Sequence, residues 1–210
     1  MKKPRLIVLD VDSTLIENEV IELLAKSAGT LDRVAKITDR AMRGELDFSA
    51  SLKERVATLE GLPERIFDEV RREIVVTQGV PRLIEETHAA GGWVGVVSGG
   101  FHEVLDPLAR QLNLDFWKAN RLEIKDGKLT GRVSANIVDA KAKAEALIDW
   151  AREKSVPLSD TVAIGDGAND LEMMAVAGLS IAFNAKPIVR EKAKVCLDQR
   201  DMSLVLDYLD

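Results

Sequence analysis

Residues 6–9 form a run of four apolar side chains that ends directly in two aspartates, Asp10 and Asp12. Four consecutive apolar residues predict a short strand that is buried on both faces, as in a parallel sheet covered by helices. The two aspartates are two positions apart, so their side chains leave an extended chain on the same side. Carboxylates held that close repel each other and are costly to bury unless a cation or a proton neutralises them. This segment therefore predicts a cation, a carboxylate nucleophile or both at the end of the first strand.

The composition excludes several classes of protein. The chain has 210 residues, 46% of them hydrophobic and 30% charged, which is typical of a globular protein with one core and a small additional unit. The net charge of −6 argues against a nucleic-acid partner, which would call for a basic face. Cys196 is the only cysteine, so no disulfide forms within the chain, and a cytoplasmic location is expected. Residues 173–183 are too short to span a bilayer, which takes about 20 residues, so no membrane partner is expected.

Residues 17–76 carry the pattern of short amphipathic helices. Apolar side chains recur at helical spacing in four segments, and Gly29, Gly44 and Gly61 end the first three of them. Four such helices in a row predict a small bundle inserted after the first strand. We therefore expect a catalytic core made of residues 1–16 and 77–210, and a helical cap made of residues 17–76.

Strands and helices alternate from residue 79 onward. Apolar runs at residues 93–97, 161–164 and 179–183 predict strands, with helical patterns between them. This alternation predicts βαβ units and a Rossmann-like, doubly wound parallel sheet. Residues 121–133 are the exception, because Asp126-Gly127 is a strong two-residue turn signal for an antiparallel hairpin. The expected fold class is α/β, with an inserted helical cap and a β-hairpin flap.

Polar residues follow three of the predicted strands. Asp10, Ser98 and Asp166 each stand directly after an apolar run. Ligands of open α/β sheets bind beyond the carboxyl ends of the strands, so these side chains are expected to converge. Ser98 is followed by Gly99 and Gly100, and a hydroxyl beside exposed backbone N–H groups suits phosphoryl oxygens.

Residues 165–170 read Gly-Asp-Gly-Ala-Asn-Asp. A dinucleotide-binding fingerprint would need a third glycine where Asp170 stands, and no Gly-x-x-x-x-Gly-Lys-Ser/Thr loop occurs in the chain. Acidic oxygens at two strand ends, with glycines that allow close approach, suit a hard cation, most simply Mg²⁺. Two alternatives stay open at this point: a glycine turn in which Asn169 or Asp170 caps the next helix, and a plain Asx-turn at Asp10 and Asp12.

A phosphoryl site also needs a fixed cation. Lys143 is a candidate, although a single lysine on a helix is usually solvated and Lys141 competes for the same role.

The segments around Asp10, Ser98, Lys143 and Asp166, in their order along the chain, resemble the four motifs of the haloacid dehalogenase superfamily of phosphotransferases. The motifs are Asp10-x-Asp12-x-Thr14, Ser98, Lys143 and Gly165-Asp166-x-x-x-Asp170. Within that superfamily, the sequences Asp-Val-Asp-Ser-Thr-Leu-Ile-Glu-Asn-Glu (10–19), Val-Val-Ser-Gly-Gly-Phe (96–101) and Ala-Asn-Arg-Leu (119–122) are similar to the branch that hydrolyses phosphoserine. The resemblance implies Mg²⁺-dependent hydrolysis of O-phospho-L-serine to L-serine and phosphate, the last step of serine biosynthesis.

The resemblance also implies roles for the motif residues of the core. Asp10 would be the nucleophile that forms an aspartyl-phosphate, and Asp12 the general acid and base. Mg²⁺ would be held by Asp10, Asp166 and the backbone carbonyl of Asp12, with Asp170 supporting the metal or the lysine. The residues that would bind the substrate from the core are Ser98, Gly99, Lys143 and Asn169.

The remaining substrate contacts would come from the cap. By the same resemblance, Glu19 would meet the α-ammonium group and Arg55 the α-carboxylate. Met42 and Phe48 would form an apolar lid that keeps water from the acyl phosphate. His102 follows the phosphate-binding turn, but the mechanism does not need it.

Other functions stay open beside the leading one. One is a related phosphatase, or a phosphotransferase that passes the phosphoryl group to an alcohol such as homoserine. Another is a regulatory phosphoacceptor domain, which would also carry an aspartate and Mg²⁺ at a strand end. Asp12 and the cap argue against the latter, because a signalling domain needs a long-lived aspartyl-phosphate. The expected partner is a small phosphate, and the expected state a monomer or homodimer.

Overall fold

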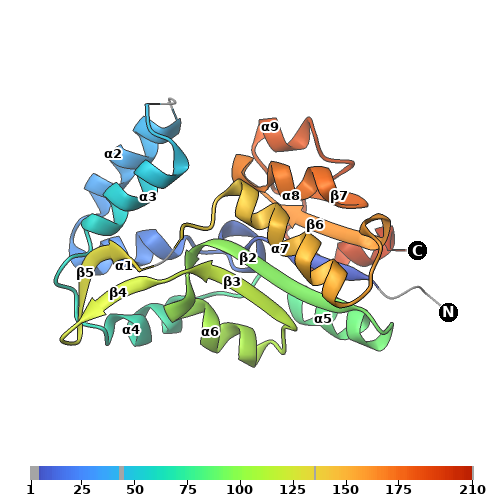
Figure 1. The fold of residues 1–210 in the computed structure, drawn as a ribbon, viewed down its shortest axis with the longest axis horizontal. Coiled ribbons are helices and arrows are strands. Elements are labelled where there is room, and N and C mark those ends of the chain that lie inside the picture. The colour runs from blue at the N-terminus through green and yellow to red at the C-terminus, as the bar shows by residue number, and fades with distance from the viewer. Residues whose placement is uncertain (1–4, 43–44, 135, 210) are drawn as a thin grey trace.

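The computed structural model describes residues 5–42, 45–134 and 136–209 of the chain, and its centre is a six-stranded parallel sheet (Figure 1). The strands are β1 (Leu6–Leu9), β2 (Trp93–Phe101), β3 (Phe116–Asn120), β6 (Thr161–Gly165), β7 (Leu179–Phe183) and β8 (Val195–Leu197). Their order across the sheet is β3-β2-β1-β6-β7-β8, and every pairing is parallel. The predicted doubly wound α/β fold is therefore confirmed.

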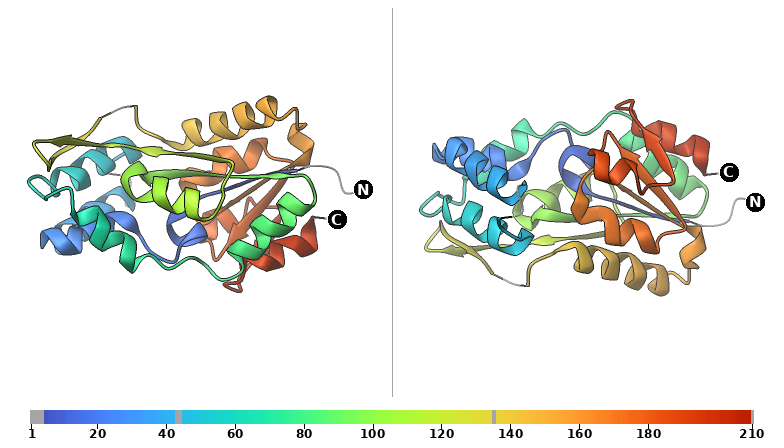
Figure 2. Two further views of the ribbon diagram at one scale, coloured as in Figure 1. Left: turned by 90° about the horizontal axis from the view of Figure 1, so that it is seen from below. Right: turned by 90° about the horizontal axis from the view of Figure 1, so that it is seen from above.

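Helices cover both faces of the sheet. Helices α5 (Val80–Ala89) and α6 (His102–Gln111) lie on one side, and α7 (Ala140–Glu153) and α8 (Leu171–Val176) lie on the other (Figure 2). The central strand shows why both layers form, since Ile7 and Leu9 join one apolar cluster and Leu6 and Val8 join the other. A strand that is apolar at every position needs a helix layer on each side to remove both of its faces from water.

Four helices lie together beyond one end of the sheet, where the sequence predicts the inserted bundle (Figure 1). They are α1 (Val20–Ala28), α2 (Leu31–Met42), α3 (Phe48–Ala57) and α4 (Ile66–Glu73). The two segments that connect them to the sheet run antiparallel, because Glu17 N–H donates to Val75 O and Thr77 N–H donates to Leu15 O, both over 2.9 Å. The division at residues 16/17 and 76/77 stays a prediction.

None of the helices in the described ranges is long and apolar enough to cross a membrane.

The predicted hairpin is present as β4 (Leu122–Lys125) and β5 (Lys128–Val133). Asp126 has φ 53° and Gly127 has φ 72°, as expected for a two-residue turn with both central residues left-handed. The hairpin reaches the helical unit through its backbone: Gly61 N–H donates to Leu129 O, and Leu129 N–H to Leu62 O, each over 2.8 Å.

Two strands and one strand end differ from the sequence prediction. Strands β3 and β8 were not expected, because β3 lacks a clear apolar alternation and β8 has three residues at the sheet edge. The strand predicted at residues 93–97 continues to Phe101, with irregular pairing to β3 between Val97 and Phe101. Ser98 therefore lies within the last, irregular part of β2 and not beyond it.

Candidate active site

The order of the sheet reverses between β1 and β6, and the site lies at this switch point. Asp10 follows β1 and Asp166 follows β6, and the Asp10 N–H donates to Ile164 O over 2.9 Å. Crevices at such points are the usual ligand sites of α/β sheets. A cavity of about 730 Å³ opens here and is lined by both the sheet end and the helical unit, including Glu19 and Arg55.

The chain leaves β1 in a tight, irregular turn, η1 (Val11–Leu15), which aims the two aspartates. Ser13 adopts a left-handed conformation with φ 58°, which is uncommon for a residue with a side chain. The Asp12 carboxylate lies close to Gly100, where a Cβ atom would come within 3.4 Å of Asp12 Oδ2 and 3.0 Å of Ser98 Oγ. Glycine at position 100 thus lets the end of β2 approach Asp12.

Lys143 is fully buried and holds two carboxylates. Its Nζ lies 2.5 Å from Asp10 Oδ1 and 2.7 Å from Asp170 Oδ1. These carboxylates outweigh the cost of burying an ammonium group and raise the pKa of Lys143. Asp139 caps α7 by accepting from Ala142 N–H, which fixes where the helix begins. Lys143 lies near this end of the helix, and its side chain reaches Asp10 at the end of β1. Lys141, the competing candidate, is exposed and pairs with Glu145.

Asp170 supports the lysine and the turn that follows β6. Its Oδ1 accepts from Lys143, and its Oδ2 accepts from Gly167 N–H over 3.1 Å. Gly165 makes room for this arrangement, because a Cβ atom there would lie 2.3 Å from Asp170 Oδ2. Both oxygens of the Asp170 carboxylate are thus occupied, which leaves Asp10 and Asp166 as the acids best placed to face a ligand.

The electrostatics of the cluster fit a hard cation. Carboxylate oxygens of Asp10, Asp166 and Asp170 lie within 4.8 Å of one another. Burial, with the charge of Asp170, raises the pKa of Asp10 to about 8 against the opposing effect of Lys143. Burial and Asp170 likewise raise the pKa of Asp166 to about 6. One buried lysine is paired with two of the three carboxylates, so the cluster keeps an excess of negative charge. Its donors are all oxygen atoms, which hard divalent cations prefer.

Asp12 differs from Asp10 in its surroundings. Burial raises the pKa of Asp12 well above its usual range, and the charges of Glu19 and Asp10 add to this. Its Oδ1 is buried and has no hydrogen-bond partner among the residues that the structure describes. A carboxyl group in this setting favours the protonated form, whereas at Asp10 a direct bond from Lys143 opposes the rise in pKa.

The irregular end of β2 around Ser98 is held in place by side chains and backbone. Ser98 is 1% exposed, and its Oγ accepts from Gly100 N–H over 2.7 Å. Asn120, at the end of β3, donates from Nδ2 to Gly99 O and accepts at Oδ1 from Val138 N–H, both over 2.8 Å. Asn120 belongs to the Ala-Asn-Arg-Leu segment that carries part of the sequence resemblance, but no role is predicted for it from the sequence. Asn120 therefore joins the end of β2 to the segment that leads into α7.

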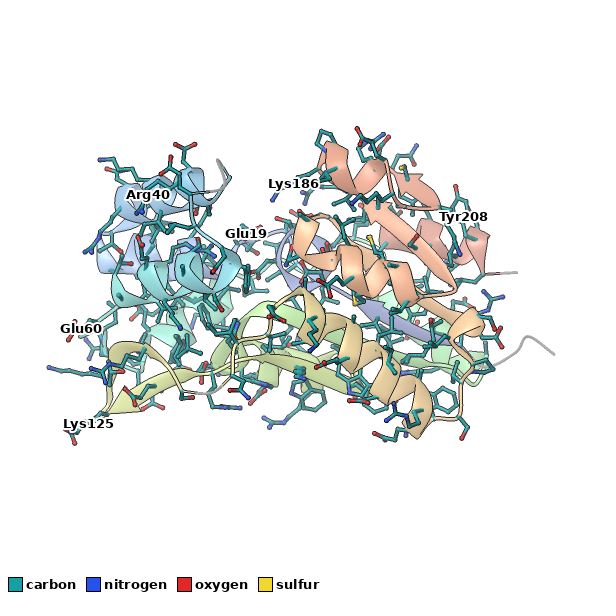
Figure 3. The ribbon with its side chains drawn as sticks, turned by 45° about the horizontal axis from the view of Figure 1, so that its top comes forward. Glu19, Arg40, Glu60, Lys125, Lys186 and Tyr208 are labelled. Carbon is teal, nitrogen blue, oxygen red and sulfur yellow. The ribbon has the colours of Figure 1, made fainter. Side chains whose placement is uncertain are left out.

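Three of the predicted substrate-binding residues of the helical unit, Glu19, Phe48 and Arg55, line the same cavity as Ser98 and Gly99. Glu19 stands at the start of α1 (Figure 3), and Arg55 in α3 is half-buried near it. Burial lowers the pKa of Arg55, against the opposing charges of Glu19, Asp12 and Glu22. Phe48 lies over Gly99, where a Cβ atom would come within 2.7 Å of Phe48 Cζ.

Asn169 and Met42 are two further residues that are predicted to contact the substrate. Asn169 is half-buried and lines the cavity. Met42 ends α2, but its side chain lies outside the described residues, so its predicted role stays a prediction.

His102 does not face the reacting groups. Its Nδ1 bonds Asp106 Oδ1 over 2.6 Å, and its Nε2 accepts from Ala119 N–H over 3.1 Å. Both ring nitrogens are thus engaged, and they tie α6 to β3. That the mechanism does not need His102 stays a prediction.

Comparisons with known proteins agree with this geometry. The haloacid dehalogenase-like hydrolase family matches residues 7–175. The phosphoserine phosphatase of Lactococcus lactis is 50% identical over 205 residues, which are 98% of this chain and 95% of that protein. A substrate-bound phosphoserine phosphatase complex superimposes with a TM-score of 0.94 at 44% identity, covering 100% of both chains. A phospho-aspartyl intermediate analogue of phosphoserine phosphatase does so with a TM-score of 0.93 at 45% identity, again over 100% of both chains. The chain therefore belongs to the haloacid dehalogenase-like hydrolase family.

Proposed function

We propose that this protein is a phosphoserine phosphatase, which hydrolyses O-phospho-L-serine to L-serine and phosphate. The observation that carries the proposal is that one cavity is lined by Asp10, whose carboxylate pairs with the buried Lys143, and by Glu19 and Arg55. The first pair suits phosphoryl transfer, and the second offers an anion and a cation to the two charged groups of an amino acid. The relatives named above support the same substrate.

In the first step, Asp10 attacks the phosphorus of the substrate. A bond forms between an Asp10 oxygen and phosphorus while the bond from phosphorus to the serine oxygen breaks. Asp12, whose pKa is raised, gives its proton to the departing serine oxygen. Lys143 holds Asp10 in place and stabilises the charge on the phosphoryl group, together with Ser98 and the backbone N–H of Gly99.

In the second step, Asp12 acts in the opposite sense. Its carboxylate takes a proton from a water molecule, which attacks the aspartyl-phosphate. Phosphate leaves, and the Asp10 carboxylate is restored. The dual role needs a carboxyl group that is near Asp10 but not paired with Lys143, and Asp12 meets both conditions.

The cation of the site is proposed to be Mg²⁺. Asp10, Asp166 and the backbone carbonyl of Asp12 would hold it, with Asp170 supporting the site through Lys143. When bound, it would reduce the repulsion between the carboxylate nucleophile and the phosphate dianion.

The helical unit, residues 17–76, is proposed to act as the cap that selects the substrate. Glu19 would bind the α-ammonium group, and Arg55 would bind the α-carboxylate with its planar fork. Phe48 lies next to Gly99 and would exclude water from the acyl phosphate.

The test is a comparison of substrates. The purified protein with Mg²⁺ is assayed on phosphoserine and on p-nitrophenyl phosphate, in wild-type form and as Glu19→Gln and Arg55→Ala variants. Both variants should raise the KM for phosphoserine and leave the KM for the aryl phosphate unchanged. Hydrolysis of the aryl phosphate without hydrolysis of phosphoserine would reject the substrate, and phosphohomoserine formed on addition of homoserine would indicate a phosphotransferase.

A further inference from the structure

Lys186 lines the active-site cavity from the sheet side, but the mechanism above gives it no role. It stands between β7 and the short helix α9 (Pro187–Arg190). Its side chain is exposed, and Figure 3 shows it projecting toward the side of the molecule where the cap helices and Glu19 lie.

The backbone of Lys186 is firmly placed next to the catalytic cluster. Its N–H donates to Asp166 O over 3.0 Å, and its own carbonyl accepts from Val189 N–H over 2.9 Å. Pro187 follows and restricts Lys186 to the extended conformation that it adopts, with ψ 151°. Only the side chain is free to move, so the ammonium group remains within reach of the cavity.

The charges that line the cavity explain why a cation is needed there. The described residues that line it include five acids, namely Asp10, Asp12, Glu19, Glu22 and Asp166. In that same set only Arg55 and Lys186 are cationic. Arg55 is half-buried among carboxylates, and Lys143 is 0% exposed beneath the cavity. An anion that approaches from solvent therefore meets Lys186 as the one exposed cation of the described lining, on a protein of net charge −6.

We propose that Lys186 is a substrate-binding residue that attracts the phosphate dianion into the cavity and offsets the repulsion from the surrounding acids. The inference rests on the proposed function only in that the substrate is a phosphate monoester. Because the effect is electrostatic and acts at an exposed position, it should change affinity and association, and it should weaken with salt.

The test compares kcat and KM of four proteins at about 0.02 M and about 0.5 M ionic strength, where screening differs strongly. The proteins are wild type, Lys186→Gln, Lys186→Arg and the matched control Lys192→Gln. Lys192 is exposed two residues beyond α9 and does not line the cavity, so the control makes the same change in net charge. Phosphoserine and p-nitrophenyl phosphate serve as substrates, and inorganic phosphate serves as a competitive inhibitor.

At low ionic strength, Lys186→Gln should lower kcat/KM and weaken inhibition by phosphate by about threefold to tenfold, with kcat retained. The loss should largely disappear at high ionic strength. Lys186→Arg should behave like wild type, and Lys192→Gln should show no loss.

Three results would overturn the inference: no change in Lys186→Gln, an equal loss at both ionic strengths, or an equal loss in Lys192→Gln. The aryl phosphate and the phosphate inhibition report on Lys186 even when phosphoserine is not a substrate. A failure of the proposed substrate is therefore distinguishable from a failure of the inference.

Discussion

The hydroxyl of Ser13 donates to Oε1 of Glu19 over 2.7 Å. This bond joins the turn that carries Asp12 to the residue that begins α1, and the backbone repeats the link, because Ser13 N–H donates to Asn18 O over 3.2 Å. The acid and base of the proposed reaction and the proposed ammonium-binding residue therefore belong to one continuous, hydrogen-bonded segment.

We expect Ser13→Ala to raise the KM for phosphoserine about tenfold to twentyfold, since a hydrogen bond to a charged group contributes about 1.5 kcal/mol or slightly more. The mutation frees the Glu19 carboxylate to rotate away from the ammonium group. Steady-state kinetics of Ser13→Ala, Glu19→Gln and the double variant measure this. The double variant should be no worse than Glu19→Gln alone, and independent, multiplying effects would contradict the link.

Asp12→Asn should trap the phosphoenzyme. With p-nitrophenyl phosphate, whose leaving group departs without a proton from Asp12, the variant can still form the aspartyl-phosphate on Asp10. It cannot take a proton from water, so this intermediate should accumulate and kcat should fall by a factor of about 10² to 10⁴. Acid quenching followed by mass spectrometry of the intact protein detects the added phosphoryl group. Asp10→Asn is the control and should show none, and unchanged turnover in Asp12→Asn would remove that residue from the mechanism.

Asp170→Asn should destabilise the fold as well as the site. Lys143 would lose one of its two carboxylates in a fully buried position, and breaking such a pair costs about 3–5 kcal/mol. Urea denaturation measures the free energy of unfolding. Asp149→Asn is a matched control, because Asp149 pairs with Arg152 on the exposed face of α7 and should contribute well below 1 kcal/mol. Equal losses in the two variants would contradict this reading of Lys143.

Without divalent cations, the contribution of Asp10 to stability should fall as the pH rises. Its pKa is 3.8 in a model compound and about 8 in the fold, so the folded protein binds more protons than the unfolded chain between these values. Calorimetry in a chelator at pH 5.5, 7 and 8.5 should show wild type losing stability relative to Asp10→Asn along this series. Added Mg²⁺ should reverse the loss at pH 8.5, and a constant difference between the two proteins would refute the assignment.

Much of the fold could be predicted because its signals are local. The apolar run of β1 and Gly29, which ends α1, act over a few residues. Gly44 lies outside the described residues, and α3 ends at Ala57, before the predicted end at Gly61. The Asp126-Gly127 turn needs only its own two left-handed residues, so the hairpin was found with its turn in place. Strands β3 and β8 were missed because their pairing with neighbours, and not their own pattern, makes them strands.

The features of the site also divide into those that depend on local sequence and those that depend on distant contacts. From the sequence alone, Asp10, Asp12 and Asp166 are predicted to follow strands and to meet at one edge of a parallel sheet. The folded chain shows in addition that Lys143, and not Lys141, is buried between Asp10 and Asp170, and that Lys186 borders the cavity. The physical reason is that strand and turn preferences depend on neighbouring residues, whereas neutralising a buried charge depends on partners that are far away in the chain. Asp10 and Lys143 are 133 positions apart, and only folding brings them to 2.5 Å.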